Sequence, residues 1–137
     1  MSALVLATVM DAIATAAGSA SGIERSYARP VEAIRPPCVV VGYPEDDIDF
    51  DVTFGNGAAR ATFPVWAVLG LQQDATTHAA LSSLATFGVL EAIASDAALL
   101  ALGAVRVDGA RIEAWDLGSE ARPLVHTAIR FSVEVTA

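Results

Sequence analysis

The sequence predicts an α+β fold, in which a mixed or antiparallel sheet of about four to five strands packs on about two to three helices. Three patterns predict this fold: apolar residues at helical spacing near the N-terminus and in the middle of the chain, strict alternation in several other segments, and a glycine-rich turn between two alternating segments. The predicted order of elements is α-β-β-β-α-(α)-β-β.

Length and composition favour one domain that spans residues 1–137. The chain has 137 residues, of which 54% are apolar, and this is enough material for a hydrophobic core. Its formal charge of −8 comes from 16 carboxylates and eight arginines, because lysine does not occur. Such a surface repels phosphates, which argues against a nucleic-acid-binding protein and against an anionic membrane as partner. Cys38 is the only cysteine, so an intrachain disulfide is excluded and a core position is expected.

The N-terminal segment predicts a helix. Ser2 is available as its N-cap and Gly18 as the stop just past its C-terminus. The segment superficially resembles a signal peptide, but it has no basic residue at its start and Asp11 interrupts the apolar stretch. The residues that share one helix face are Leu6, Val9, Met10, Ile13 and Ala17.

An extended connector and a buried strand follow. Residues 23–37 contain three prolines and three arginines, which indicates an extended path with room for a short strand near residues 23–27. Residues 38–43 form a β-branched run bounded by proline on both sides, as expected for a strand that is buried on both faces.

A long hairpin is predicted next. Residues 48–54 alternate apolar and polar side chains, the Gly55-Asn56-Gly57 turn follows, and residues 58–69 return as the partner strand. Trp66 and Val68 make the second face of the return strand apolar, so that end must be covered. Pro64 cannot donate a ladder hydrogen bond, which places its nitrogen at an edge or a bulge.

The second half of the chain predicts helices followed by two strands. Asp74 or Thr76 can cap a helix, and Ser95-Asp96 can cap a shorter one that runs to Leu102 before Gly103. Strands are expected at residues 105–115 and 124–135. The residues that share a face of the first of these helices are Leu81, Leu84, Ala85 and Gly88.

The sequence contains no residue pattern typical of catalysis, cofactor binding or metal binding, and it therefore predicts a protein that is not an enzyme. His78 and His126 are far apart, and Cys38 has no partner at metal-ligand spacing. Asp47, Asp49 and Asp51 resemble the start of a calcium loop, but the positions that need Gly and Glu are occupied by other residues.

The three aspartates have another interpretation. On a strand they stand about 7 Å apart on one face, which is too wide for all three to bind one ion. They form either a solvated face, an electrostatic contact or the repulsive lining of a pore. The arginines of the connector, Arg25, Arg29 and Arg35, are expected to pair with carboxylates within or between subunits.

In the order and spacing of these elements the chain resembles the tail-terminator proteins of long-tailed (siphovirus-like) bacteriophages, and the resemblance covers most of its length. It rests on the N-terminal helix, the Arg35-Pro36-Pro37-Cys38 passage into the first core strand, and the hairpin around Gly55-Asn56-Gly57. The capped helix from Asp74, the Asp96–Leu100 turn and the closing strand at residues 129–135 complete it.

The resemblance implies a virion protein of the tail neck, made in the host cytoplasm, that forms a hexameric ring. The ring binds the finished tube of tail-tube protein, stops its polymerisation and presents its other face to head-completion (stopper) proteins, while DNA passes through without being bound. In this ring the lumen would be lined by Asp47, Asp49 and Asp51. The predicted subunit-interface residues are Arg29, Arg35, Glu45, Asp46, Asn56, Arg60 and Trp66.

Two alternatives stay open at this point. One is another head-tail connector or stopper protein of the phage neck, which would also assemble as a ring. The other is a small α+β ligand-binding domain or enzyme with a pocket between sheet and helices. A ring supports assembly, whereas a monomer or dimer with an enclosed pocket supports the ligand-binding protein.

Overall fold

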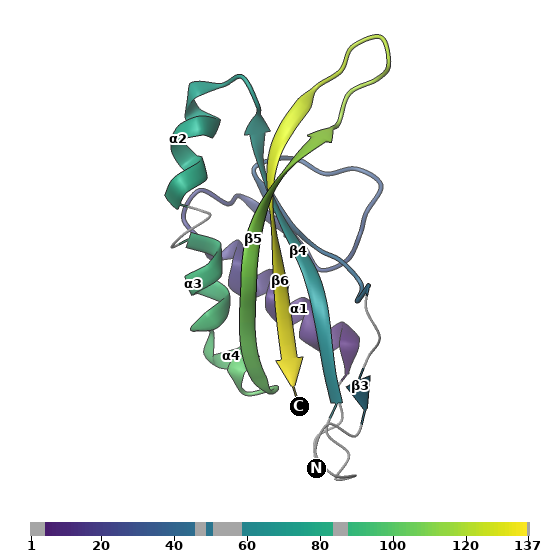
Figure 1. The fold of residues 1–137 in the computed structure, drawn as a ribbon, viewed down its shortest axis with the longest axis vertical. Helices are drawn as coiled ribbons and strands as arrows, with labels where there is room; N and C mark the ends of the chain where they lie inside the picture. Colours follow the sequence, from purple (N-terminus) through teal and green to yellow (C-terminus); the bar gives the residue numbers. More distant parts are fainter. Residues whose placement is uncertain (1–4, 46–48, 51–58, 84–87, 137) are drawn as a thin grey trace.

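The computed structural model describes residues 5–45, 49–50, 59–83 and 88–136. In chain order its elements are α1 (Leu6–Gly18), β1 (Arg25–Tyr27), β2 (Cys38–Val41), β3 (Asp49–Phe50), β4 (Ala59–Leu71), α2 (Ala75–Ser83), α3 (Val89–Ala94), α4 (Ala97–Leu100), β5 (Ala104–Asp116) and β6 (Val125–Thr136), as Figure 1 shows.

The strands form one mixed sheet, which confirms the α+β class. Its order is β1-β2-β4-β6-β5, and β3 pairs with β4 beside this path. Only β1 and β2 run parallel, while all other neighbouring strands are antiparallel. Among the described residues the sheet has six strands, which are the five in the predicted order and β1, the short strand for which the connector left room.

The core lies between the sheet and the helices. Figure 1 shows α1 behind the sheet, with α2, α3 and α4 in a column along its side. The predicted apolar face of α1 is confirmed, because Val9, Met10, Ile13 and Ala17 are buried. They belong to one cluster with alternate residues of the central strands, of which Phe63 and Phe131 are the largest: the strand residues are Val39, Val41, Ala61, Phe63, Val65, Ala67, Leu69, Ile129, Phe131, Val133 and Val135.

A smaller apolar cluster lies on the opposite face of the sheet. Val68 and Cys38 are fully buried there, and Tyr27 and Ile34 from the connector side pack against them together with Trp66. The prediction that the second face of β4 is covered at this end is therefore confirmed. No helix of the described residues covers the rest of this face, over β4, β6 and β5, and we call it the open face.

The glycine after α1 does not act as the predicted helix stop. Gly18 is still helical, and the next residue, Ser19, keeps a right-handed backbone with φ of −78°. The left-handed residue comes later, at Gly22 with φ of +94°. Gly18 is required for packing instead, because a Cβ there would lie 2.9 Å from the hydroxyl oxygen of Ser26 in β1. The predicted cap Ser2 lies outside the described residues.

Local predictions elsewhere agree with the structure. β3 and β4 pair antiparallel, with Asp49 opposite Arg60, as a hairpin requires. The turn at residues 55–57 and strand residues 51–54 are outside the described part. Asp96 caps α4, since its carboxylate accepts a hydrogen bond from the backbone N–H of Leu99 at 2.9 Å. Pro64 accepts a 2.8 Å bond from the N–H of Gly42, so its nitrogen faces the flank of β4 just beyond the last β2–β4 pair.

Candidate functional site

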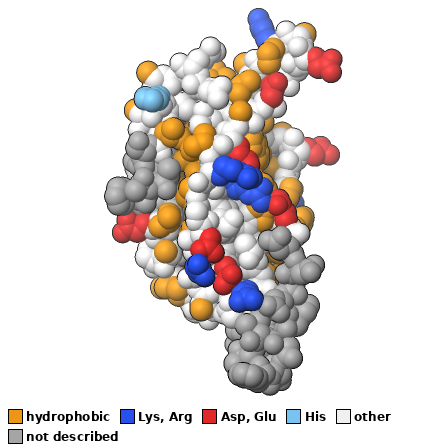
Figure 2. All heavy atoms as spheres, viewed as in Figure 1, with side chains coloured by type: hydrophobic (Ala, Val, Ile, Leu, Met, Phe, Trp, Pro, Cys, Tyr) orange, Lys and Arg blue, Asp and Glu red, His pale blue; other side chains and the backbone are white. Residues whose placement is uncertain are grey.

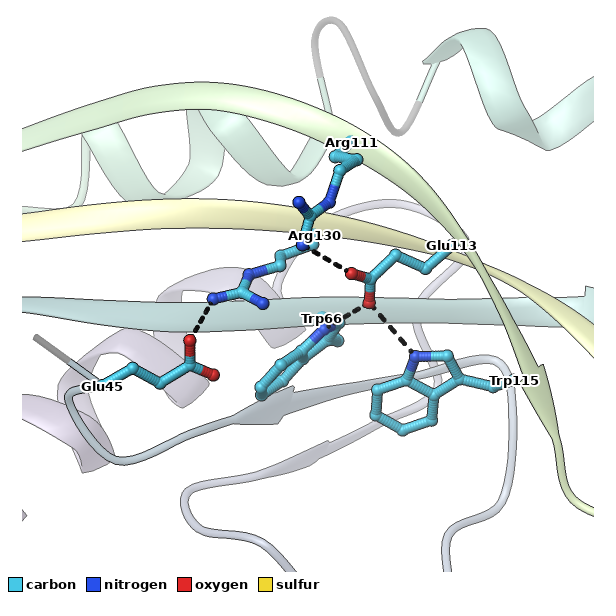
Figure 3. Close-up of polar contacts among 6 residues, drawn as sticks. All are labelled: Glu45, Trp66, Arg111, Glu113, Trp115 and Arg130. Carbon is cyan, nitrogen blue, oxygen red and sulfur yellow. Dashed lines mark hydrogen bonds and ion pairs between the residues drawn. The ribbon is translucent and has the colours of Figure 1, made fainter.

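A cluster of aromatic and charged side chains occupies the middle of the open face. The central strands bring it together, because the register sets Trp66 of β4 opposite Arg130 of β6, and Arg130 opposite Arg111 of β5. Side chains directly opposite one another in a sheet point to the same face. We call the six residues of Figure 3 the Trp–Glu cluster: Glu45, Trp66, Arg111, Glu113, Trp115 and Arg130.

Glu113 is the centre of this cluster. The indole N–H of Trp66 donates to its Oε1 at 2.9 Å, the N–H of Trp115 donates to the same oxygen at 3.4 Å, and Nη2 of Arg111 donates to Oε2 at 2.9 Å. Partial burial of the carboxylate opposes its ionisation, but the hydrogen bonds from Trp66, Arg111 and Trp115 outweigh this effect and lower the pKa of Glu113. The carboxylate is therefore held in its charged form by donors from two strands.

Arg130 connects the cluster to the chain between β2 and β3. Its guanidinium donates to the carboxylate of Glu45 at 2.6 Å and lies 5.3 Å from the ring centroid of Trp66. The rings of Trp66 and Trp115 are 5.6 Å apart and tilted by 56°, within the range of favourable aromatic pairs. The side chain of Arg130 is 23% exposed and that of Glu45 is 54% exposed, so this ion pair is only partly shielded from solvent.

Acid is expected to weaken the fold through Glu113. Because its folded-state pKa is depressed, its stabilising contribution is present above the unfolded pKa, about 4.3, and disappears as the pH falls through the lower folded value. Glu113→Gln should therefore lose less stability than the wild type between about pH 5 and pH 3. Urea unfolding at several pH values measures this difference, with Glu120→Gln in the exposed β5–β6 loop as the control. Equal pH dependence in wild type and Glu113→Gln would contradict the assignment.

The structure places the predicted interface residues in different regions. Glu45 and Trp66 both belong to the Trp–Glu cluster, within one chain. Arg29 and Arg35 are exposed on the connector, and neither has an ion pair with another described residue. Arg60 is half-buried in β4. Of the other predicted residues, only the backbone of Asp49 is described, in β3, while Asp46, Asp47, Asp51 and Asn56 lie outside the described residues.

Sequence reasoning missed four members of the cluster: Arg111, Glu113, Trp115 and Arg130. The alternation of β6 did place Arg130 on its polar face. Nothing local, however, connects Glu113 with Trp66, which lies 47 positions earlier. The available signal was a carboxylate flanked by apolar residues in a predicted strand, and only the strand register shows that Trp66 lies near it.

The remaining chemical groups are separate from this cluster. Cys38 is fully buried, and burial raises the pKa of its thiol to about 11, against a smaller opposing effect of Arg25. His78 is exposed on α2, and Nδ1 of His126 lies 2.9 Å from the carbonyl oxygen of Leu124. Within the described ranges, no group of three or more His, Cys, Asp or Glu residues is placed to share a metal ion, and no helix is long and apolar enough to span a bilayer.

Charges of both signs share the open face. Figure 2 shows them gathered over the middle of the sheet. The ion pairs there are Arg106–Asp108 at 2.8 Å, Arg111–Glu113 at 2.9 Å and Arg130–Glu45 at 2.6 Å. Such a face suits contact with another protein better than contact with a polyanion. No protein-family model matches the chain, and no curated protein sequence is significantly similar to it.

Proposed function

We propose that the chain is a structural subunit of a long-tailed bacteriophage, a tail terminator that forms a ring at the head-proximal end of the tail. In this role it ends polymerisation of the tail-tube protein and joins the tail to the head-completion proteins. The observation that carries the proposal is the long free edge at β5. This strand has 13 residues and pairs only with β6 among the described residues.

A sheet with free edges at both ends can be extended by other copies. In the described part of the chain, β5 ends the sheet on one side and the three-residue strand β1 ends it on the other. Unpaired strand edges bind further strands through their backbone N–H and C=O groups. Because these two edges are different surfaces, joining one copy to the next is a head-to-tail contact, and such contacts close into rings when the rotation permits.

The connector supplies charge for the same contact. Arg29 and Arg35 are exposed close to β1 in the chain, and they have no ion pair within the described residues. Glu45, a predicted interface residue, is already bound within the chain by Arg130 at 2.6 Å. In the proposed ring Arg29 and Arg35 pair with other carboxylates of a neighbouring copy, and residues 46–51 offer four of them in the sequence.

The lumen of the ring is the expected place of Asp47, Asp49 and Asp51. Carboxylates there repel the phosphates of passing DNA and keep the genome from adhering to the wall. The support for this assignment is the alternation of the three residues along the strand, of which β3 includes Asp49. The net charge of −8 acts in the same direction.

The ring is tested by reversing the connector charges. We expect the wild type to form a ring of about six subunits in native mass spectrometry and to co-sediment with tubes assembled from a tail-tube protein of a long-tailed bacteriophage. The double variant Arg29→Glu/Arg35→Glu should lose the ring, because it replaces the attraction with repulsion. Arg122→Glu, which reverses a similarly exposed arginine in the β5–β6 loop, is the control. A wild-type chain that remains monomeric at high concentration and does not bind tubes would refute the proposal.

A further inference from the structure

The free edge of β5 has a charge pattern that is complementary to itself. Along the open face the strand presents Arg106, Asp108, Arg111 and Glu113, and all residues from 108 to 112 are exposed. In an antiparallel pair each residue lies opposite a residue counted in reverse order. The order of the four charges is basic, acidic, basic, acidic, and in the reverse direction it is acidic, basic, acidic, basic. A second, antiparallel copy therefore places an opposite charge across from each of the four residues.

We propose that two copies of this chain pair β5 to β5, antiparallel, about a twofold axis at Ala110, which lies opposite the same residue of the other copy while Gly109 is the extra residue of a bulge. Arg106 of each copy then lies opposite Glu113 of the other, and Asp108 lies opposite Arg111. The two symmetric copies make four such contacts. The two sheets become one continuous sheet, in which both β5 strands are central.

The bulge in β5 makes this register possible. The pairing of β5 with β6 shifts between Asp108 and Ala110, where Gly109 has a φ of +59°. The extra residue places Arg106, Asp108, Arg111 and Glu113 on the same face, although the first two have even numbers and the last two odd numbers. Opposite residues in the proposed pair therefore point to the same side of the joined sheet, as strand pairing requires.

The other face of the same register is apolar. Val107 of one copy lies opposite Ile112 of the other. Ile112 is 52% exposed in the single chain, and among the described large apolar residues only Tyr43 and Val5 are more exposed. Pairing covers this side chain with a β-branched partner, which is a favourable cross-strand combination.

Neighbouring registers are disfavoured by the same charges. A shift by two residues in one direction sets Arg106 opposite Arg111, and the same shift in the other direction sets Asp108 opposite Glu113. Like charges that lie directly opposite one another are destabilising. A strand edge with mixed charges ordinarily resists pairing, but here the order of the charges selects one register.

Within one chain the four charges pair along the strand, Arg106 with Asp108 and Arg111 with Glu113. The side chains of Arg106, Asp108 and Arg111 are exposed, so exchanging their contacts for contacts across the twofold axis costs little. Glu113 is only 23% exposed and keeps the hydrogen bond from Trp66 when Arg106 of the other copy approaches it. The inference depends on the β5 edge alone and not on the ring. An edge that is paired with a twofold partner cannot, however, pair with a head-to-tail neighbour. Free subunits paired in this way would therefore have to separate before they join a ring built through β5.

Two single charge reversals test the register. Asp108→Arg sets two basic residues opposite one another at each contact, and Arg111→Asp sets two acidic residues opposite one another. Each variant alone should dimerise at least about tenfold more weakly than the wild type. An equimolar mixture of the two should recover dimers, because every 108–111 contact between the different chains is then between opposite charges. Sedimentation velocity up to about 1 mM protein measures the dimers, and circular dichroism checks that each variant is folded.

The double variant Asp108→Arg/Arg111→Asp separates contacts between chains from contacts within a chain. Within a chain it creates two pairs of like charges, one at positions 106 and 108 and one at positions 111 and 113. If only contacts within a chain matter, this variant should therefore dimerise most weakly. Across the twofold axis it restores opposite charges, so we expect it to dimerise nearly as well as the wild type. A monomeric wild type, or a mixture no more dimeric than its components, would overturn the pairing. Binding to tail tubes is measured in a separate experiment. Neither the presence nor the absence of dimers therefore decides the proposed function.

Discussion

Leu99→Ala is expected to lower the free energy of unfolding by about 2–5 kcal/mol, because the side chain is fully buried beneath α4 and its removal leaves a cavity. The adjacent variant Leu100→Ala removes the same atoms from a side chain that is 46% exposed, and should cost less than about 1 kcal/mol. Urea unfolding followed by tryptophan fluorescence measures both. Because the two residues share one helix, the comparison isolates burial from helix propensity.

This comparison also tests how α4 is attached to the sheet. The helix has only four residues, which is too short for it to be stable by itself, and Asp96 caps it through the N–H of Leu99. Leu99 belongs to the same buried cluster as Ile13 of α1 and Phe131 of β6. Similar losses for Leu99→Ala and Leu100→Ala would mean that α4 does not pack on this core.

Several elements were predictable because their signals are local. The apolar face of α1 follows from residues three and four positions apart, and the cap of α4 from a single aspartate before an apolar run. The closing strand β6 was predicted from the alternation of its residues, and most of its expected apolar face is buried, although Thr127 and Ala128 are buried as well. The buried residues of that predicted face are Ile129, Phe131, Val133 and Val135. In each case the residues that determine the structure lie within a few positions of one another.

The features that could not be predicted depend on strand order. Gly18 was predicted to end α1, but it serves the contact with Ser26, which exists only because β1 pairs with β2. The hydrogen bond from Trp66 to Glu113 requires β4, β6 and β5 to lie side by side in one register. The sequence contains these residues but gives no local sign of their proximity. The charged residues of β5 likewise share one face only because of a bulge, and the bulge is visible only in the pairing of β5 with β6.

Trp66→Ala is expected to lower the free energy of unfolding by about 2–4 kcal/mol. The substitution removes the ring contact with Trp115, the contact with Arg130 and the hydrogen bond to Glu113. It also uncovers Cys38 and Val68 in the smaller apolar cluster. Urea unfolding followed by circular dichroism measures the loss. Trp66→Phe keeps a ring but removes the indole N–H, and should cost about 1 kcal/mol.

The size of this loss distinguishes two roles for Trp66. The sequence suggested a residue at a subunit interface, whereas in the structure its indole is directed to Glu113 and Trp115 of the same chain (Figure 3). A residue that mainly serves an interface would weaken assembly and leave the stability of the single chain unchanged when it is replaced. A residue that holds β4 and β5 together should destabilise the single chain at a concentration at which no assembly forms. We expect the second result, because the hydrogen bond and the ring contact both join strands of one sheet.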